Sequence, residues 1–158
     1  MIYIGIGSNL GNRITNIEKA KYYLHTSGIN IVRSSKYYET LSWPDISKPK
    51  FINIVIQSNT RFTPERYLKI FKYIEKKLGR KKGRKNDPRI CDIDIISYDQ
   101  KISVDSITLP HKRMHKRNFV LIPLYEINKN WFHPKLKKSI KRLIFSLPIK
   151  DIRSIKQI

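Results

Sequence analysis

The apolar residues of this chain change their spacing in an order that few folds accommodate. Residues 2–6 and 51–59 have the apolar or alternating character of buried strands, and residues 29–39 and 89–96 predict two more. Segments with helical spacing follow residues 2–6 and residues 51–59. The order strand, helix, strand, strand, helix, strand predicts an α+β domain whose antiparallel sheet is backed by helices.

Both expected helices carry clear boundary signals. The first follows a glycine- and asparagine-rich turn at residues 7–12 and stops at Gly28. The second begins at residues 63–65, where threonine caps the helix, proline takes the first helical position and glutamate follows. Its apolar stripe stops at Gly79. These signals place each helix between two strands, as the α+β order requires.

The second half of the chain adds smaller elements to this core. A turn at Asp99-Gln100 predicts a hairpin that reaches Ile107, and residues 119–127 predict a short helix or a buried turn. Apolar residues at helical spacing predict a last helix over residues 136–147. No repeat or long linker divides the sequence. We therefore expect one domain over residues 1–147, followed by a tail, residues 148–158, that frays.

Composition limits the classes of protein to consider. A hydrophobic fraction of 40% in 158 residues is sufficient for a real core, so disorder is not expected. Cys91 is the only cysteine, which excludes an internal disulfide and favours a reducing compartment. The sequence shows neither a basic leader with a long apolar stretch nor about 18 consecutive apolar residues. We expect a soluble, cytoplasmic protein without a membrane partner.

A formal net charge of +21 raises the question of a nucleic-acid partner. The alternative is compositional drift, because lysine far exceeds arginine, isoleucine far exceeds valine and Ala20 is the only alanine. The lysines lie along the whole chain rather than in one block. We favour drift and expect no dedicated nucleic-acid partner, although the charge would still help to recruit a small polyanion.

The sequence Asp92-Ile93-Asp94 is the clearest chemical feature. Because side chains alternate along a strand, Cys91, Ile93 and Ile95 are expected to face the core. The two carboxylates then share the opposite face, roughly 6.6 Å apart along the strand. Carboxylates so close repel each other unless a cation lies between them, and Mg²⁺ prefers such oxygen ligands. The alternative is an ordinary amphipathic strand with one solvated face.

Two cationic segments flank this pair. Residues 80–86 hold basic side chains around Gly83 and no apolar one, so they predict a mobile, solvated loop. The cations on either side of the pair are Arg80, Lys82, Arg84 and Arg89 before it and His111, Arg113, His115 and Arg117 after it. Two acids between two cationic segments fit a metal–triphosphate site. A solvated surface charge remains the alternative for each arginine, and a structural hydrogen bond remains the alternative for His111.

Three motifs follow one another within residues 2–130. They are Gly7-Ser8-Asn9-Leu10-Gly11, then Pro88-Arg89-Ile90-Cys91-Asp92-Ile93-Asp94-Ile95, and then Leu109-Pro110-His111 with Arg117-Asn118-Phe119-Val120-Leu121-Ile122-Pro123-Leu124. The first motif matches neither a P-loop nor a dinucleotide fingerprint. In this order the three motifs resemble the 6-hydroxymethyl-7,8-dihydropterin pyrophosphokinase family.

The resemblance implies a ferredoxin-like βαββαβ core with an added hairpin and a C-terminal helix. It also implies an enzyme of folate biosynthesis, which transfers pyrophosphate from ATP to 6-hydroxymethyl-7,8-dihydropterin and releases AMP. By the same resemblance, Asp92 and Asp94 hold two Mg²⁺ ions, and Arg80 and Arg89 are catalytic. The implied ATP-binding residues are Glu75, Lys82, Arg89, His111 and Arg117, and the implied pterin-binding residues are Thr40, Leu41, Phe51, Asn53 and Phe119.

The residue types at the implied pterin site suit that ligand. Phe51 and Phe119 could sandwich a flat ring, although burial in the core is the alternative for both. Asn53 offers a donor and an acceptor for an amide-like ring edge. The chain departs from the family pattern at residues 40–44, where it reads Thr-Leu-Ser-Trp-Pro, and at Asn86, where some relatives carry tryptophan.

An RNA-recognition module is the rival prediction, because a basic ferredoxin-like sheet also describes that class. Such modules present aromatic side chains on two central strands. Neither residues 51–59 nor residues 90–96 show that pattern, and paired aspartates would repel phosphate without a metal. We therefore expect a monomeric enzyme with ATP and hydroxymethyl-dihydropterin as its ligands.

Overall fold

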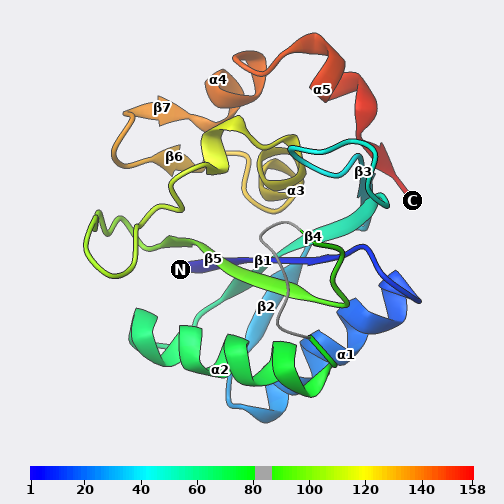
Figure 1. The fold of residues 1–158 in the computed structure, drawn as a ribbon. Coiled ribbons are helices and arrows are strands. Elements are labelled where there is room, and N and C mark those ends of the chain that lie inside the picture. The colour runs from blue at the N-terminus through cyan, green and yellow to red at the C-terminus, as the bar shows by residue number, and fades with distance from the viewer. Residues whose placement is uncertain (81–86) are drawn as a thin grey trace.

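An antiparallel sheet runs through the centre of the protein in the computed structural model, which describes residues 1–80 and 87–158. Among these residues the sheet has six strands, in the order β5-β1-β4-β3-β8, with β2 also paired to β4 (Figure 1). The strands are β1 (Ile2–Ser8), β2 (Ile31–Ser34), β3 (Tyr38–Thr40), β4 (Phe51–Ser58), β5 (Asp92–Tyr98) and β8 (Lys156–Gln157). The predicted α+β class is confirmed.

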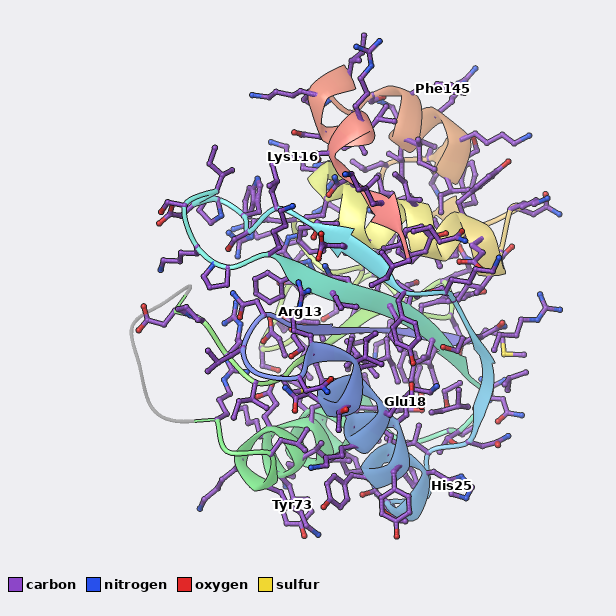
Figure 2. The ribbon with its side chains drawn as sticks, turned by 90° about the vertical axis from the view of Figure 1, so that its right-hand side faces the viewer. Arg13, Glu18, His25, Tyr73, Lys116 and Phe145 are labelled. Atoms are coloured by element: carbon purple, nitrogen blue, oxygen red, sulfur yellow. The ribbon has the colours of Figure 1, made fainter. Side chains whose placement is uncertain are left out.

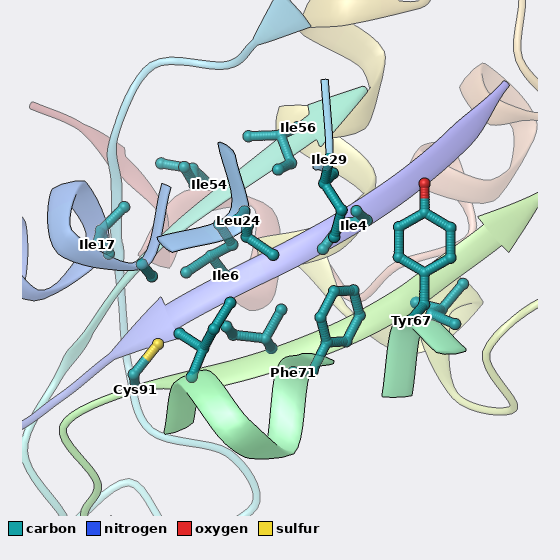
Figure 3. Close-up of a cluster of buried hydrophobic side chains, with 14 of the residues drawn as sticks. Ile4, Ile6, Ile17, Leu24, Ile29, Ile54, Ile56, Tyr67, Phe71 and Cys91 are labelled. Atoms are coloured by element: carbon teal, nitrogen blue, oxygen red, sulfur yellow. The ribbon is translucent and has the colours of Figure 1, made fainter. Parts of the chain in front are cut away.

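Two helices, α1 (Arg13–Thr26) and α2 (Pro64–Lys77), cover one face of the sheet (Figure 1). Both begin at a capping side chain, since Asn12 accepts a hydrogen bond from Thr15 N–H and Thr63 accepts one from Arg66 N–H. The side chains buried between these helices and the sheet include Ile4, Ile6, Ile17, Leu24, Ile54, Ile56, Tyr67, Phe71 and Cys91 (Figure 3). This core holds β1, β4 and β5 in place from one side.

A second helical layer covers part of the opposite face. It contains a 3₁₀ turn (Met114–Lys116), α3 (Asn118–Ile127) and α4 (Ile140–Phe145) (Figure 1). Tyr3, Val55 and Ile96 of the sheet pack into this second core. Ile96 reaches it by ordinary alternation, because Ile95 before it faces the first core. The pairing of β1 with β5 then shifts between Tyr3 and Ile4, and the extra residue on β5 returns Tyr98 to the first core.

Two expected elements in the middle of the chain differ from the structure. The single strand over residues 29–39 is two strands, β2 and β3. The hairpin expected over residues 99–107 is reduced to one bridge between Ser103 and Leu109. Its apolar residues Ile102 and Val104 are exposed, so no other side chains pack against them to stabilise strand pairing there.

The last predicted helix begins later than expected. Residues 136–139 contribute to a small hairpin instead, formed by β6 (Phe132–His133) and β7 (Lys138–Ser139). Helix α4 then starts at Ile140, where the Ser139 side chain accepts a hydrogen bond from Arg142 N–H. Among the described residues, no helix combines the length and apolar character needed to cross a membrane.

The C-terminal tail is ordered, so the expectation that residues 148–158 fray is wrong. The tail forms α5 (Ile149–Ser154) and then β8, which pairs with β3 through Tyr38 and Glu39. Ile158 N–H also donates a hydrogen bond of 3.0 Å to the Tyr37 carbonyl. The edge of β3 offers unpaired backbone groups, and the tail satisfies them.

Candidate active site

The part of the second sheet face that α3 and α4 leave uncovered forms a pocket of about 370 Å³. Its lining residues are Gly5, Ile6, Gly7, Thr40, Leu41, Trp43, Phe51, Asn53, Ile54, Arg80, Arg89, Asp92, Asp94, Ile96, His111, Arg113, Arg117, Phe119 and Val120. Eleven of the thirteen residues predicted for the site are in this set. Of the other two, Glu75 lies behind the pocket, and Lys82 is outside the described residues.

The two carboxylates share the open face of β5, as the alternation predicts. Asp92 pairs in register with Gly7 of β1, and Asp94 pairs with Gly5. These glycines place no side chain beside the carboxylates, while Ile93 between them is buried in the first core. Burial and then repulsion by Asp94 raise the pKa of Asp92, against the opposing effects of Arg89 and Arg80.

This donor set fits a magnesium ion that is shared with a ligand. Among the described residues, no group of three or more His, Cys, Asp or Glu side chains could hold a metal. Mg²⁺ usually takes only one or two carboxylates and completes its shell with phosphate oxygens and water. Asp92 and Asp94 therefore match the oxygen chemistry of Mg²⁺ bound together with a polyphosphate.

Arg80 and Arg89 both reach Asp92. Arg80 Nη1 lies 3.1 Å from Asp92 Oδ1, and Arg89 Nε lies 3.4 Å from Asp92 Oδ2. The Arg89 Nε atom is buried and makes no hydrogen bond among the described residues. The two guanidinium groups neutralise Asp92 in this state, and Arg89 retains a donor for an additional acceptor.

Glu75 lies beneath β5 rather than in the pocket. Only 8% of the residue is exposed, and its Oε1 accepts the backbone N–H of Ile93 at 2.9 Å. The same oxygen lies 2.5 Å from Arg80 Nη1. The strand N–H and the guanidinium together hold the carboxylate beneath β5, outside the residues that line the pocket. Glu75 therefore forms an ion pair with Arg80 from the helix-covered side of the sheet.

His111 lies on the other side of the carboxylates and is uncharged at neutral pH. Burial, followed by the charges of Arg117 and Arg113, lowers the pKa of His111 to about 4. Its Nδ1 atom accepts the backbone N–H of Arg113 at 3.2 Å. In this neutral tautomer, Nε2 carries the proton and is a hydrogen-bond donor for a ligand.

The far end of the pocket combines aromatic and amide groups. Phe51 and Phe119 are only partly buried and both line the pocket, together with Thr40 and Leu41. Asn53 Nδ2 donates a hydrogen bond of 2.9 Å to Thr40 Oγ1, which fixes the amide. A Cβ atom at Gly7 would come within 2.6 Å of Asn53 Oδ1. The glycine therefore makes room for this side chain across the sheet.

The site predicted from the sequence omits three side chains. Trp43 and Arg113 line the pocket, and Asn9 holds the backbone of Arg89 just outside it. The signals were the aromatic residue in an irregular loop, the cation between His111 and Arg117, and an asparagine in a turn. Each has a common structural explanation, so only the fold reveals that Trp43 and Arg113 line one pocket and that Asn9 borders it.

Comparison with known proteins places this geometry in context. A sequence model of the family described as 7,8-dihydro-6-hydroxymethylpterin-pyrophosphokinase (HPPK) matches residues 3–129. The 2-amino-4-hydroxy-6-hydroxymethyldihydropteridine pyrophosphokinase of Aquifex aeolicus is 38% identical over 141 residues, which cover 89% of this chain and 88% of that relative. The corresponding protein of Methylorubrum extorquens is 37% identical over 127 residues, 79% of this chain and 80% of the relative.

Other relatives are much longer. The mitochondrial folate synthesis bifunctional protein of Arabidopsis thaliana is 37% identical over 80% of this chain, but the chain spans only 23% of that protein. The crystal structure of Plasmodium falciparum HPPK-DHPS with SDX-DHP has a TM-score of 0.73 and covers 99% of this chain, which matches 47% of that one. At 15% identity this second likeness establishes the fold alone.

Proposed function

Because the chain belongs to the 7,8-dihydro-6-hydroxymethylpterin-pyrophosphokinase family, we propose that it transfers pyrophosphate from ATP to 6-hydroxymethyl-7,8-dihydropterin. The products are AMP and the pterin pyrophosphate used in folate synthesis. The observation that carries this proposal is the two-ended pocket. The carboxylates lie on β5, with Arg80 and Arg89 against Asp92, whereas Phe51 and Asn53 lie across β1 on β4.

The charged end is the proposed binding site for MgATP. Asp92 and Asp94 would hold Mg²⁺, which when bound supplies positive charge against the phosphate oxygens. Arg80 and Arg89, which now neutralise Asp92, become available for phosphate once another cation takes their place. The Nε2–H of His111 donates a hydrogen bond to a phosphate oxygen without adding positive charge, and Arg117 is close enough to influence His111 electrostatically.

The aromatic end is the proposed pterin site. Phe51 and Phe119 offer ring faces for a flat heterocycle, worth about 1 kcal/mol beyond simple burial. Asn53 is held by Thr40 and can use its remaining donor and acceptor atoms on the amide-like edge of the ring. Leu41 completes the apolar wall.

The reaction needs no nucleophile from the protein. The hydroxymethyl oxygen attacks the β-phosphorus of ATP and loses its proton. The bond from that phosphorus to the oxygen bridging the α- and β-phosphates breaks, and the oxygen leaves with AMP. Positioning of the two substrates and neutralisation of charge by the arginines supply the catalysis.

We also retain three finer expectations as proposals. Two Mg²⁺ ions act with each ATP, the enzyme works as a monomer, and it resides in the cytoplasm. The single cysteine is free and buried, which supports a reducing compartment.

The test is formation of AMP from ATP and Mg²⁺ with three additions: 6-hydroxymethyl-7,8-dihydropterin, its 6-methyl analogue, or buffer. We expect AMP only with the hydroxymethyl compound, in equal amount to the pterin pyrophosphate. Equal AMP from all three mixtures would indicate simple ATP hydrolysis and contradict the proposal. Absence of AMP from all three would also contradict it.

A further inference from the structure

Two guanidinium groups of the second cationic segment lie over the ring of Trp43. The guanidinium carbon of Arg113 is 5.2 Å from the centre of the Trp43 ring, and that of Arg117 is 5.5 Å away. Arg117 is also 5.3 Å from the ring centre of Phe119. All four side chains line the pocket, so this cluster belongs to its wall rather than to a distant surface.

The ring counteracts a repulsion that would otherwise separate the two cations. In the described part of the chain, neither Arg113 nor Arg117 forms an ion pair with a carboxylate within 4.0 Å. Burial lowers the pKa of Arg117, and the charge of Arg113 lowers it further, against the opposing attraction of Asp94 and Asp92. The negative face of an indole attracts a guanidinium group, most strongly where water is excluded. Trp43 therefore stabilises an arrangement that is unfavourable for the arginines alone.

One donor in the cluster lacks an acceptor. Arg117 Nε is buried and makes no hydrogen bond to any described residue. A buried guanidinium N–H without a partner costs free energy, and an oxyanion at this position would satisfy it. Two adjacent cations with an unused donor match an anion that carries more than one charge.

We propose that Trp43 is a positioning residue that holds Arg113 and Arg117 together as a binding site for the pyrophosphate group that the pterin receives. This inference rests on the proposed function and adds two residues to it. Arg117 contacts the rings of both Trp43 and Phe119, and Phe119 belongs to the proposed pterin site. Arg80 and Arg89 lie against Asp92 instead. Arg89 also borders the proposed pterin site, since its guanidinium carbon is 6.0 Å from the centre of the Phe51 ring. The Trp43 cluster is therefore a second cationic group beside that site, next to Phe119.

The indole contributes as a ring and not as core packing. The Trp43 residue is 41% exposed, so its removal leaves no large internal cavity. Phenylalanine retains an aromatic face at this position, whereas leucine retains only apolar bulk. The pair Trp43→Phe and Trp43→Leu thus separates attraction of cations from simple shape.

The experiment measures binding of inorganic pyrophosphate by calorimetry, without ATP or metal. We expect Trp43→Leu to weaken binding by several-fold to about tenfold, and Trp43→Phe to retain most of the affinity. Arg113→Gln should weaken binding at least as much. Lys112→Gln is the matched control, because Lys112 is an exposed cation of the same segment that does not line the pocket.

A double-variant comparison tests whether Trp43 acts through the arginines. In an Arg113→Gln, Arg117→Gln background, Trp43→Leu should cause no additional loss of affinity. The inference is overturned by unchanged binding in Trp43→Leu, by the same loss in both backgrounds, or by no measurable binding in the parent protein. Thermal melts verify that each variant is folded.

The AMP assay keeps the two proposals distinguishable. Trp43-dependent binding of pyrophosphate without AMP formation would reject the proposed reaction and retain the anion site. If AMP forms and pyrophosphate binding does not depend on Trp43, only this inference is rejected.

Discussion

Asn9 and Arg89 are joined by two hydrogen bonds between the turn after β1 and the segment before β5. Asn9 Oδ1 accepts the Arg89 N–H at 2.8 Å, and the Asn9 N–H donates to the Arg89 carbonyl at 3.2 Å. Asn9 Nδ2 also donates to the Pro49 carbonyl at 3.2 Å, and only 3% of the residue is exposed. One buried amide therefore connects two loops that border the pocket.

Removal of the Asn9 side-chain amide should lower turnover, because Arg89 would no longer be held in position. Asn9→Ala leaves the Arg89 N–H without its side-chain acceptor, and we expect a loss of about 1–3 kcal/mol in unfolding free energy. Misplacement of a positioned cation by about 1 Å can cost about 100-fold in rate, so turnover should fall more than nucleotide affinity. Asn9→Asp retains the acceptor and should recover part of the rate. A folded Asn9→Ala protein with normal turnover would exclude a positioning role.

Neutralisation of Asp94 should lower turnover when Mg²⁺ is present and should strengthen ATP binding when it is absent. With Mg²⁺ present, we expect Asp94→Asn to lower turnover at least about 100-fold, because a proposed metal ligand is lost. In EDTA the same variant should bind ATP several-fold more tightly than the parent protein, because repulsion of the triphosphate is reduced. Asp105→Asn, an exposed acid outside the pocket, is the control. Equal ATP affinity of both proteins in EDTA would contradict this assignment.

Two substitutions separate the roles of the Glu75 side chain. Glu75→Ala removes the acceptor of the buried Ile93 N–H and should lower unfolding free energy by about 1–3 kcal/mol. Glu75→Gln preserves an acceptor but not the charge that faces Arg80, so it should cost less stability. If Glu75 positions Arg80, the glutamine variant should have lower turnover at nearly unchanged ATP affinity. Thermal melts and steady-state rates measure the two effects, and a large loss of ATP affinity would favour direct contact with the nucleotide.

The buried His133 should make the protein less stable as pH falls. Burial, followed by His115, lowers the pKa of His133 to about 4, and its Nδ1 accepts the Leu136 N–H at 3.1 Å. Between this value and an unfolded pKa of about 6.5, the unfolded chain binds the proton and the folded protein does not. Stability is therefore lost as pH falls, by roughly 2 kcal/mol between pH 7 and pH 5 for this group.

His133→Asn preserves an acceptor near the position of Nδ1 and does not titrate. Its loss of stability between pH 7 and pH 5, measured by urea unfolding, should be smaller than that of the parent protein. Parallel losses in the two proteins would show that His133 does not contribute to the acid response.

Local patterns predicted the parts of the fold that local chemistry determines. Alternation across Asp92-Ile93-Asp94 was sufficient to assign one side chain to the core and two to the opposite face. In the structure Ile93 is in the core, and Asp92 and Asp94 line the pocket. The capping threonine at residue 63 marked the start of α2 correctly. Both results follow from neighbours a few residues apart, which a sequence displays directly.

The sequence does not display contacts that distant segments make with one another. The tail is ordered because the edge of β3, more than a hundred residues earlier, accepts β8. Glu75 faces inward because Ile93 presents its N–H there, and no periodicity within α2 reveals this partner. The roles proposed for Trp43 and Asn9 depend likewise on contacts that only the folded chain brings together.

The pairing of β5 with β1 makes the proposed chemistry inseparable from the correct register. A slip of one residue would turn Ile93 toward the ligand and drive both Asp92 and Asp94 into an isoleucine-rich interior. Two buried, unpaired carboxylates would make such a misfolded form strongly unfavourable. The same aspartates that repel each other in the finished pocket therefore act during folding as a safeguard against the wrong strand alignment.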